Sequence, residues 1–285
     1  MSSVVKMVPP ALKPMVRWYR AMVRRYWDAP KVRRMFGRLA PMVPPEILMH
    51  DGPPTYEEFK GNFDESFGIF RDVAGLQPHE KMLDLGCGIG RKTIPLTQYL
   101  NNDGVYWGLD IVRFGIEWCL RTITTRYPNF RFQTIDVYNK HYNPTGKVLA
   151  RDYRLPFDDR SFDLVHLGSV FTHMLPLDVE NYMAEIRRVV KPSGRCLLSW
   201  FLLNPESQAL IDAGKSSLYL AHEVERGCRT SSPDDPEVAI GYEEQYVRAL
   251  YRKHGFRDDM ATHYGSWCGR SKFLTYQDLI LAHVS

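Results

Sequence analysis

The apolar and polar positions of the chain follow two periods, and the changes between them mark the expected elements. Short apolar runs bounded by turn residues indicate buried strands, and apolar positions three or four residues apart indicate helices. The expected strands are 81–86, 105–111, 129–137, 161–170, 195–203 and 276–284, and the expected helices are 91–100, 114–126, 179–190 and 243–254. Strands that alternate with helices predict an α/β fold with a doubly wound, mostly parallel sheet, and a ligand site beyond the carboxyl ends of the strands.

The first 55 residues differ from this pattern. Apolar positions from Met15 to Trp27 have helical spacing, and the first 40 residues hold ten Lys and Arg against one acid, Asp28. A basic amphipathic helix is typical of peripheral membrane contact or of an acidic partner. It equally fits a cover or a homodimer contact on a catalytic domain. We expect a basic helical extension over 1–55 and the main domain over 56–285.

Residues 204–241 show neither period. The stretch follows the fifth expected strand and includes the loop-like sequence SSPDDPE. A long segment without a period inside a compact domain is commonly functional. The interpretation is a lid or substrate wall inserted after strand five.

The composition indicates the cellular compartment of the protein and argues against one class of partner. The five cysteines form no C-x-x-C pair, which fits neither a disulfide framework nor a zinc ribbon, so a reducing cytoplasm is expected. No apolar run approaches the roughly 20 residues of a membrane span. The chain is acidic on balance outside its basic first 40 residues, which argues against a nucleic-acid groove.

A glycine-rich stretch, LDLGCGIGR, follows the first expected strand. It places Gly86, Gly88 and Gly90 two residues apart, and Asp84 stands just before them. Glycines there let the backbone turn tightly and let a ligand approach closely. The spacing departs from the dinucleotide motif G-x-G-x-x-G, and a carboxylate at Asp84 would repel a pyrophosphate but attract a sulfonium or ammonium. The loop therefore favours a cationic nucleoside without phosphate, which is S-adenosylmethionine.

Acidic residues after the next strands complete the expected cofactor site. Asp110 ends the second strand beside Ile111, where an acid can accept both ribose hydroxyls. Asp136 ends the third strand, and the pair Asp152 and Tyr153 follows one loop later. Either acid could meet the adenine edge, and the sequence leaves this choice open.

Four motifs in order make the chain similar to the class I S-adenosylmethionine-dependent methyltransferases. They are LDLGCGIGR at 83–91, GLD at 108–110, LPFDDRSFDLV at 155–165 and RRVVKPSGR at 187–195. The resemblance implies a Rossmann-like sheet of seven strands whose last strand is antiparallel. It also implies a set of cofactor contacts: Asp84, Gly86, Cys87, Gly88, Gly90, Asp110, Ile111, Asp136, Asp152, Tyr153, and the backbone at Leu167 and Gly168.

One departure from the family pattern lies between Asp136 and the LPF motif. The sequence YNKHYNPTGKVLAR is inserted there. The inserted loop would bring Tyr138, His141, Tyr142 and Asn143 near the mouth of the site. The alternative is a surface loop without a role in binding.

A hydroxyl acceptor needs a base to remove its proton, and a histidine can hold that proton near neutral pH. His173, in SVFTHM just past the fourth strand, is the candidate, and its alternative role is to cap or pack the next helix. His141, His222 and His263 are reserve bases. No E-x-x-H or H-x-x-x-H pair predicts a dedicated metal cage. Acidic residues could still hold Mg²⁺ beside an acceptor diol.

The acceptor is inferred from what is present and what is missing. The chain lacks both the N-P-P-Y motif of nucleic-acid amino methyltransferases and the P-C pair of base C5 chemistry. The phrases YNKHYNP, SVFTHM and GSWCGR resemble bacterial glycan and glycolipid methyltransferases, including actinobacterial enzymes that act on mannosides. A saccharide hydroxyl is therefore favoured, with Trp107, Trp200, Trp267 and His263 as further acceptor contacts. The alternatives are O-methylation of a lipid or small aromatic metabolite, and a non-catalytic cofactor-binding scaffold.

Overall fold

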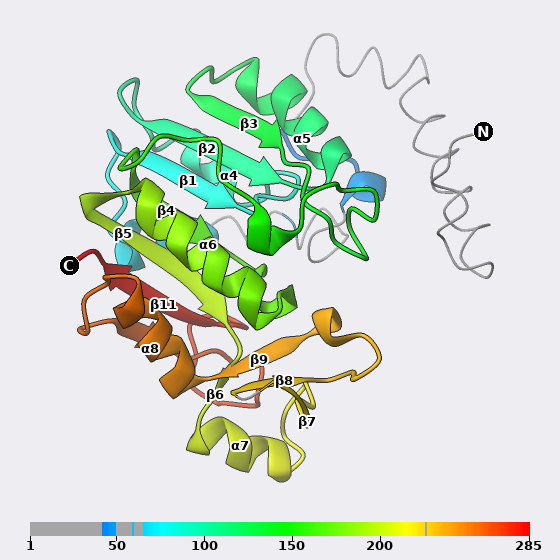
Figure 1. Ribbon diagram of the computed structural model, residues 1–285. Coiled ribbons are helices and arrows are strands. Elements are labelled where there is room, and N and C mark those ends of the chain that lie inside the picture. Colours follow the sequence, from blue (N-terminus) through cyan, green and yellow to red (C-terminus); the bar gives the residue numbers. More distant parts are fainter. Residues whose placement is uncertain (1–41, 50–58, 60–64, 226) are drawn as a thin grey trace, which may run out of the picture.

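The computed structural model describes residues 42–49, 59, 65–225 and 227–285 (Figure 1). The basic helix predicted at 15–27 lies outside these residues. The strands are β1 (Lys81–Leu85), β2 (Val105–Asp110), β3 (Phe130–Thr134), β4 (Phe162–Leu167), β5 (Val190–Trp200), β6 (Leu202–Leu203), β7 (His222–Glu225), β8 (Cys228–Thr230), β9 (Ile240–Glu243), β10 (Ala261–His263) and β11 (Asp278–His283). The α-helices are α4 (Thr93–Leu96), α5 (Arg113–Cys119), α6 (Pro176–Val189), α7 (Pro205–Asp212) and α8 (Glu244–Lys253). Short 3₁₀ or π turns are η2 (Glu46–Leu48), η3 (Ile69–Val73), η4 (Leu120–Thr124), η5 (Ala150–Asp152), η6 (Phe171–His173) and η7 (Pro236–Val238).

Seven strands form the main sheet in the order β10-β11-β5-β4-β1-β2-β3. Strand β11 pairs antiparallel with both β5 and β10, whereas the pairs among β5, β4, β1, β2 and β3 are parallel. This arrangement confirms the predicted Rossmann-like α/β sheet. Because β1 lies between β4 and β2, the residues that follow these three strands meet at one edge of the sheet.

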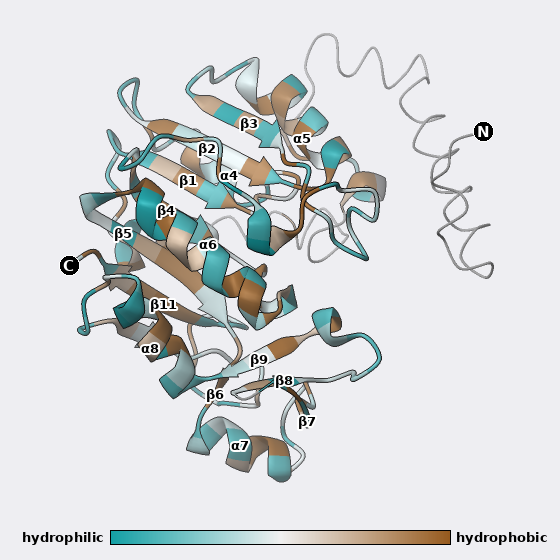
Figure 2. Cartoon of the chain, viewed as in Figure 1, coloured by the Kyte–Doolittle hydropathy of each residue, from teal (hydrophilic) through white to brown (hydrophobic). Residues whose placement is uncertain are grey.

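The two faces of the sheet bury different cores. Side chains of a strand alternate between faces, so Leu83 and Leu85 pack on the side of α6 and α8, while Met82 packs on the side of α4 and α5. Figure 2 shows that α6 and α8 each carry hydrophobic and hydrophilic residues, as expected for helices with one face on a sheet. Both faces of the sheet are therefore covered, and its ligand site opens at an edge.

The bounds of several helices and strands differ from the bounds that the periodicity predicts. The helix expected at 91–100 is only the short α4, and the helix expected at 114–126 is α5 continued by the π turn η4. The third strand ends at Thr134 instead of Val137. Strand β10 was not predicted, because three residues are too few to show a period.

The segment 204–241 is an ordered unit. It contains α7, β7, β8, η7 and the first half of β9, and β6 completes a four-stranded sheet in the order β6-β9-β8-β7. The unit has its own small core, which includes Phe201, Ile211 and Trp267. Buried Asp278 of β11 joins it to the main sheet by accepting hydrogen bonds from Leu202 N and Trp267 Nε1, each at 2.7 Å. Its role as a lid remains a prediction.

Candidate active site

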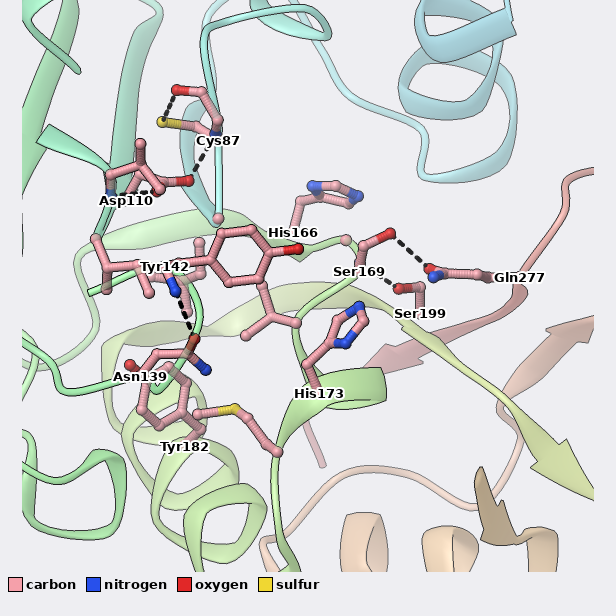
Figure 3. Close-up of a pocket in the computed structure, with 18 of the residues that line it drawn as sticks. Cys87, Asp110, Asn139, Tyr142, His166, Ser169, His173, Tyr182, Ser199 and Gln277 are labelled. Atoms are coloured by element: carbon pink, nitrogen blue, oxygen red, sulfur yellow. Dashed lines mark hydrogen bonds between the residues drawn. The ribbon is translucent and has the colours of Figure 1, made fainter. Parts of the chain in front are cut away.

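A cavity of about 920 Å³ opens where β1, β2 and β4 end. One end of it, shown in Figure 3 near Cys87 and Asp110, is called the Asp110 end. The other, around Ser169, His173 and Gln277, is called the His173 end. The cavity therefore has two ends that are lined by different residues.

The glycine loop supplies the wall of the Asp110 end. Gly86, Cys87 and Gly88 line the cavity, and Gly86 and Gly88 have φ of 80° and 57°, which favour glycine. A Cβ at Gly86 would overlap the side chain of Val170. Gly90 does not line the cavity: a Cβ there would lie 2.9 Å from Cys119 Sγ, so this glycine serves the contact between loop and helix. Two of the three predicted glycines thus line the cavity.

Asp110 is fixed at the end of β2 with its carboxylate at the cavity. Its Oδ2 accepts a hydrogen bond from Gly88 N at 2.8 Å, and its Oδ1 accepts one from Val112 N at 2.7 Å. A carboxylate at the end of the second strand is the group that accepts ribose hydroxyls in nucleoside sites of this kind. The geometry therefore suits the ribose role predicted for Asp110.

Beyond Asp110 the cavity wall becomes apolar. Ile111, Ile135, Val137 and Ala150 line it and form a slot of the kind that holds a flat base. Cavity walls of this composition bind a heterocycle mainly by burial of its faces.

The acids predicted to meet the adenine do not reach this slot. Asp136 and Asp152 are exposed and Tyr153 is half-buried, and none of the three lines the cavity. Beyond Thr134 the chain still alternates, so Ile135 and Val137 turn inward and Asp136 turns outward. The structure thus places these three side chains outside the cavity lining, and their contact with the cofactor stays a prediction.

Asp84 lies behind the cavity wall. It is fully buried, accepts a hydrogen bond from the Tyr106 hydroxyl at 2.7 Å and faces Nδ1 of His166 at 2.7 Å. Burial alone would raise the pKa of the Asp84 carboxyl, but its pairing with His166 and nearby Lys92 holds the pKa below its ordinary value. Asp84 therefore does not touch a ligand directly. His166 does line the cavity, and sequence reasoning missed it because a histidine inside an apolar strand resembles a core residue.

His173 lines the opposite end, on the turn η6. Its Nδ1 lies 2.9 Å from the carbonyl oxygen of Glu237, which fixes Nδ1 as the donor and leaves the lone pair on Nε2. Burial lowers the pKa of His173 below its ordinary value, so the ring is neutral at pH 7. Its state is the one that a general base requires.

Ser169 is a second feature of the His173 end that the sequence did not reveal. It has a φ of 59°, uncommon for a residue other than glycine, and it lines the cavity. Its backbone N–H donates to Ser199 Oγ at 2.8 Å, and its hydroxyl donates to Gln277 Oε1 at 3.0 Å. These two bonds hold the strained residue between the ends of β4, β5 and β11.

Only some of the inserted-loop residues predicted near the mouth of the site line the cavity. Tyr138 and Tyr142 line the cavity, and Asn139 Oδ1 fixes the loop by accepting from the N–H groups of His141 and Tyr142. The His141 side chain instead faces Asp235 at 3.2 Å, outside the cavity lining.

None of the three tryptophans predicted to contact the acceptor, Trp107, Trp200 and Trp267, lines the cavity. Trp200 and Trp267 are fully buried in cores, so neither ring can stack on a sugar. His263 on β10 does not line the cavity. Large aromatic residues are most often core residues, and the sequence offered nothing to distinguish these two tryptophans from the rest.

Residues 42–49, 59, 65–225 and 227–285 contain no group of three or more His, Cys, Asp or Glu side chains arranged to hold a metal ion. No helix within the same ranges has the length and apolar character needed to cross a membrane.

The chain is similar to known methyltransferases over part of its length. The family described as "Methyltransferase domain" matches residues 83–198, which are less than half of the chain. The chain resembles the S-adenosylmethionine-dependent methyltransferases over these residues. An uncharacterized methyltransferase of Schizosaccharomyces pombe is 27% identical over 115 residues, which are 40% of this chain and 37% of the yeast protein. The match thus spans little more than a third of that relative.

Solved structures of other proteins are similar to most of this chain. A Pyrococcus horikoshii protein has a TM-score of 0.54 at 18% identity, covering 81% of this chain and 93% of its own. This likeness shows the fold. A Methanosarcina mazei structure described as an S-adenosylmethionine-dependent methyltransferase has a TM-score of 0.49 at 20% identity, covering 76% of this chain and 96% of its own. Within the methyltransferase domain lie the glycine loop, Asp110 and His173, whereas Glu237 and Gln277 lie beyond it.

Proposed function

We propose that the protein transfers a methyl group from S-adenosylmethionine to a hydroxyl of a saccharide or glycolipid acceptor. The observation that carries the proposal is His173, a neutral imidazole on the cavity wall with Nδ1 committed to the Glu237 carbonyl. Nε2 can therefore take the proton of an acceptor hydroxyl. A base in this position typically contributes about 10² to 10⁴ in rate.

The residues of the Asp110 end fit the adenosine part of this cofactor. Asp110 can receive the two ribose hydroxyls, and the apolar slot beside Ile111 and Val137 can hold the adenine ring. When bound, S-adenosylmethionine supplies a methyl group on a positively charged sulfur. The protein's task is then to hold donor and acceptor in line, and orientation of this kind can supply about 7 to 11 kcal/mol of a barrier.

The His173 end suits an acceptor rich in hydroxyls. Ser169, Gln277, Tyr142 and Tyr276 all line it, and each offers an uncharged polar group. Such groups can donate to and accept from sugar hydroxyls. Tyrosine rings also supply flat surfaces, which the buried tryptophans cannot.

An apolar portion on the acceptor is favoured by the rim of the cavity. Leu149 and Tyr276 line the cavity and are 39% and 48% exposed, and exposed Leu177, Val238 and Leu274 each adjoin a lining residue. Exposed apolar side chains at or next to residues that line a cavity favour the binding of an apolar molecule. This supports a glycolipid over a free sugar, and it keeps a lipid or small aromatic metabolite as the second candidate.

A methyl-release assay tests the function. Labelled S-adenosylmethionine would be incubated with manno-oligosaccharides, glycolipids, long-chain alcohols and phenols, each with and without a chelator. Transfer to sugar hydroxyls, strongest for glycolipids, is the expected result. Transfer only to phenols or alcohols would move the assignment to the second candidate, and binding without any transfer would favour the scaffold. Loss of activity with a chelator would show that Mg²⁺ assists.

A further inference from the structure

The orientation of His173 depends on a segment of the four-stranded unit. The hydrogen on its Nδ1 is accepted by the Glu237 carbonyl oxygen, which belongs to the turn η7. This turn lies in the connection 231–239 between β8 and β9, which reaches toward the start of α6 (Figure 1). Connections in β-hairpins usually have about 2 to 5 residues. This longer connection needs contacts of its own to hold a single conformation.

The hydroxyl of Thr230 ties the connection together from inside. Thr230 is fully buried at the end of β8, and its Oγ1 lies 3.0 Å from the carbonyl oxygens of both Pro236 and Ala239. The same oxygen accepts a hydrogen bond from Ser232 N at 3.1 Å. One side chain therefore joins the start of the connection to residues before and after Glu237.

The hydroxyl of Thr230, and not only its shape, is what this position uses. Thr230 lies on the buried side of β8, where an apolar residue is usual. Valine would fill nearly the same volume, but the Ser232 N–H and the Pro236 carbonyl would lose their partner. A polar group that loses its partner inside a protein is costly, so we expect the connection to rearrange. Glu237 follows Pro236 directly, and its carbonyl would then move away from His173.

The outer side of the connection is held more weakly. Asp235 forms ion pairs with Lys140 Nζ at 3.0 Å and with His141 Nε2 at 3.2 Å, both on the inserted loop. Lys140 and His141 are exposed, whereas Thr230 is fully buried. Ion pairs of exposed side chains contribute little because water screens them. The position of η7 therefore depends chiefly on the buried hydroxyl.

We propose that Thr230 is a positioning residue for His173. By holding η7, Thr230 keeps the Glu237 carbonyl at Nδ1, so the neutral ring carries its hydrogen on Nδ1 and its lone pair on Nε2. In the other tautomer Nε2 carries the hydrogen and cannot take a proton. When Nε2 takes the proton of the acceptor hydroxyl, the ring becomes an imidazolium whose Nδ1 hydrogen the carbonyl still accepts. The inference rests on the proposed function, and it gives the four-stranded unit a part in the chemistry.

NMR of the full chain with labelled histidine nitrogens reads the tautomer of His173, because protonated and unprotonated ring nitrogens have well-separated shifts. His173→Ala identifies its signals by their loss among the nine histidines. At a pH where the ring is neutral, the unaltered protein should carry the hydrogen on Nδ1. Thr230→Val should move the population toward the tautomer with the hydrogen on Nε2. Thr230→Ser keeps the hydroxyl and should therefore keep the hydrogen on Nδ1.

Turnover gives a second measurement, with labelled S-adenosylmethionine and a mannosyl glycolipid as the acceptor. Thr230→Val should lower kcat about tenfold to a hundredfold, which is part of the 10² to 10⁴ that a base supplies, and leave the affinity for S-adenosylhomocysteine unchanged. Thr230→Ser should restore kcat. Thr122→Val is the matched control, since Thr122 is also fully buried, donates to the Trp118 carbonyl oxygen at 2.8 Å and does not line the cavity. This control should leave both the tautomer and kcat unchanged.

The outcomes separate this inference from the function on which it rests. A hydrogen on Nε2 in the unaltered protein would overturn the inference before any variant is made. It would also be overturned if Thr230→Val kept the hydrogen on Nδ1, or if Thr122→Val changed the tautomer equally, because the effect would then be a general loss of stability. A shifted tautomer with an unchanged kcat would support the role of Thr230 in holding the ring and count against the proposed function, since His173 would not be the base.

Discussion

The two ends of the cavity are built in different ways. The Asp110 end is formed by residues at the ends of three adjacent strands, and backbone N–H groups of the same loops hold its key carboxylate. The His173 end collects separate segments, including the inserted loop at 138–142, η6, Glu237 of the four-stranded unit and Gln277 before β11. Under the proposed function, the nucleoside binds at the edge of the sheet itself. The acceptor binds at the connections between elements, which can vary without disturbing the sheet.

The largest effect is expected from His173→Ala. Loss of the base should reduce kcat by about 10² to 10⁴ with little change in affinity for S-adenosylhomocysteine. Because burial lowers the pKa of His173, the rate of the unaltered protein should rise with pH below the ordinary histidine value of about 6.5 and be flat above it. The variant should lack this inflection. His263→Ala, away from the cavity lining, is the control. A near-normal kcat in His173→Ala would mean that another group takes the proton.

The second effect is expected on stability, at Asp278, which connects the seven-stranded sheet to the four-stranded sheet. The Asp278 carboxylate is fully buried and accepts from Gly265 N and Arg270 as well as from the four-stranded unit. Asp278→Asn should lower the free energy of unfolding by about 1 to 3 kcal/mol, because the buried Arg270 guanidinium loses its ion pair with Asp278 and keeps only the one with Glu206. Urea unfolding would measure this change in the free energy of unfolding, with the variant Asp259→Asn, at an exposed position, as the control. A change equal to the control's would show that Asp278 does not secure the unit.

A smaller effect is expected at the Asp110 end. Asp110→Ala should weaken S-adenosylhomocysteine by about 1 to 3 kcal/mol, since two ribose hydroxyls would lose their acceptor. Asp136→Ala and Asp152→Ala should leave the affinity unchanged, because both side chains are exposed outside the cavity. Calorimetry on the three variants would decide. A loss at Asp136 or Asp152 comparable to that of Asp110→Ala would restore the adenine role predicted from the sequence.

The same contrast explains what the sequence could predict. Buried strands and the glycine loop follow local patterns, so β1, β2, the turn at Gly86 and the place of Asp110 could all be predicted. The boundary of β3 could not, since apolar residues continue past Thr134 while the ladder stops. Because neighbouring side chains in this segment point to opposite sides, Ile135 faces the cavity and Asp136 does not.

Contacts between distant segments were beyond the sequence patterns. His173 was named from its place after β4, but its partner at Glu237 lies 64 residues away. Ser169 and Gln277 are 108 residues apart and meet only because β5 lies between β4 and β11. For Trp200 and Trp267, the residue type suggested a contact with the acceptor. In the structure, both rings are buried in hydrophobic cores. Residue type alone therefore says little about which face of an element a side chain occupies.

The smallest expected effect separates strain from chemistry at Ser169. Ser169→Gly removes the hydroxyl and adopts the φ of 59° without strain, so stability should change by less than about 1 kcal/mol. Ser169→Ala removes the same hydroxyl but keeps the strained backbone. If the hydroxyl binds the acceptor, both variants should raise the acceptor KM by a similar factor, about threefold to tenfold for one neutral hydrogen bond. Cofactor affinity should stay constant, because Ser169 is held by Ser199 and Gln277 and not by the glycine loop. If only Ser169→Ala raises KM, the backbone conformation is what matters, and the hydroxyl serves to hold Gln277 in place.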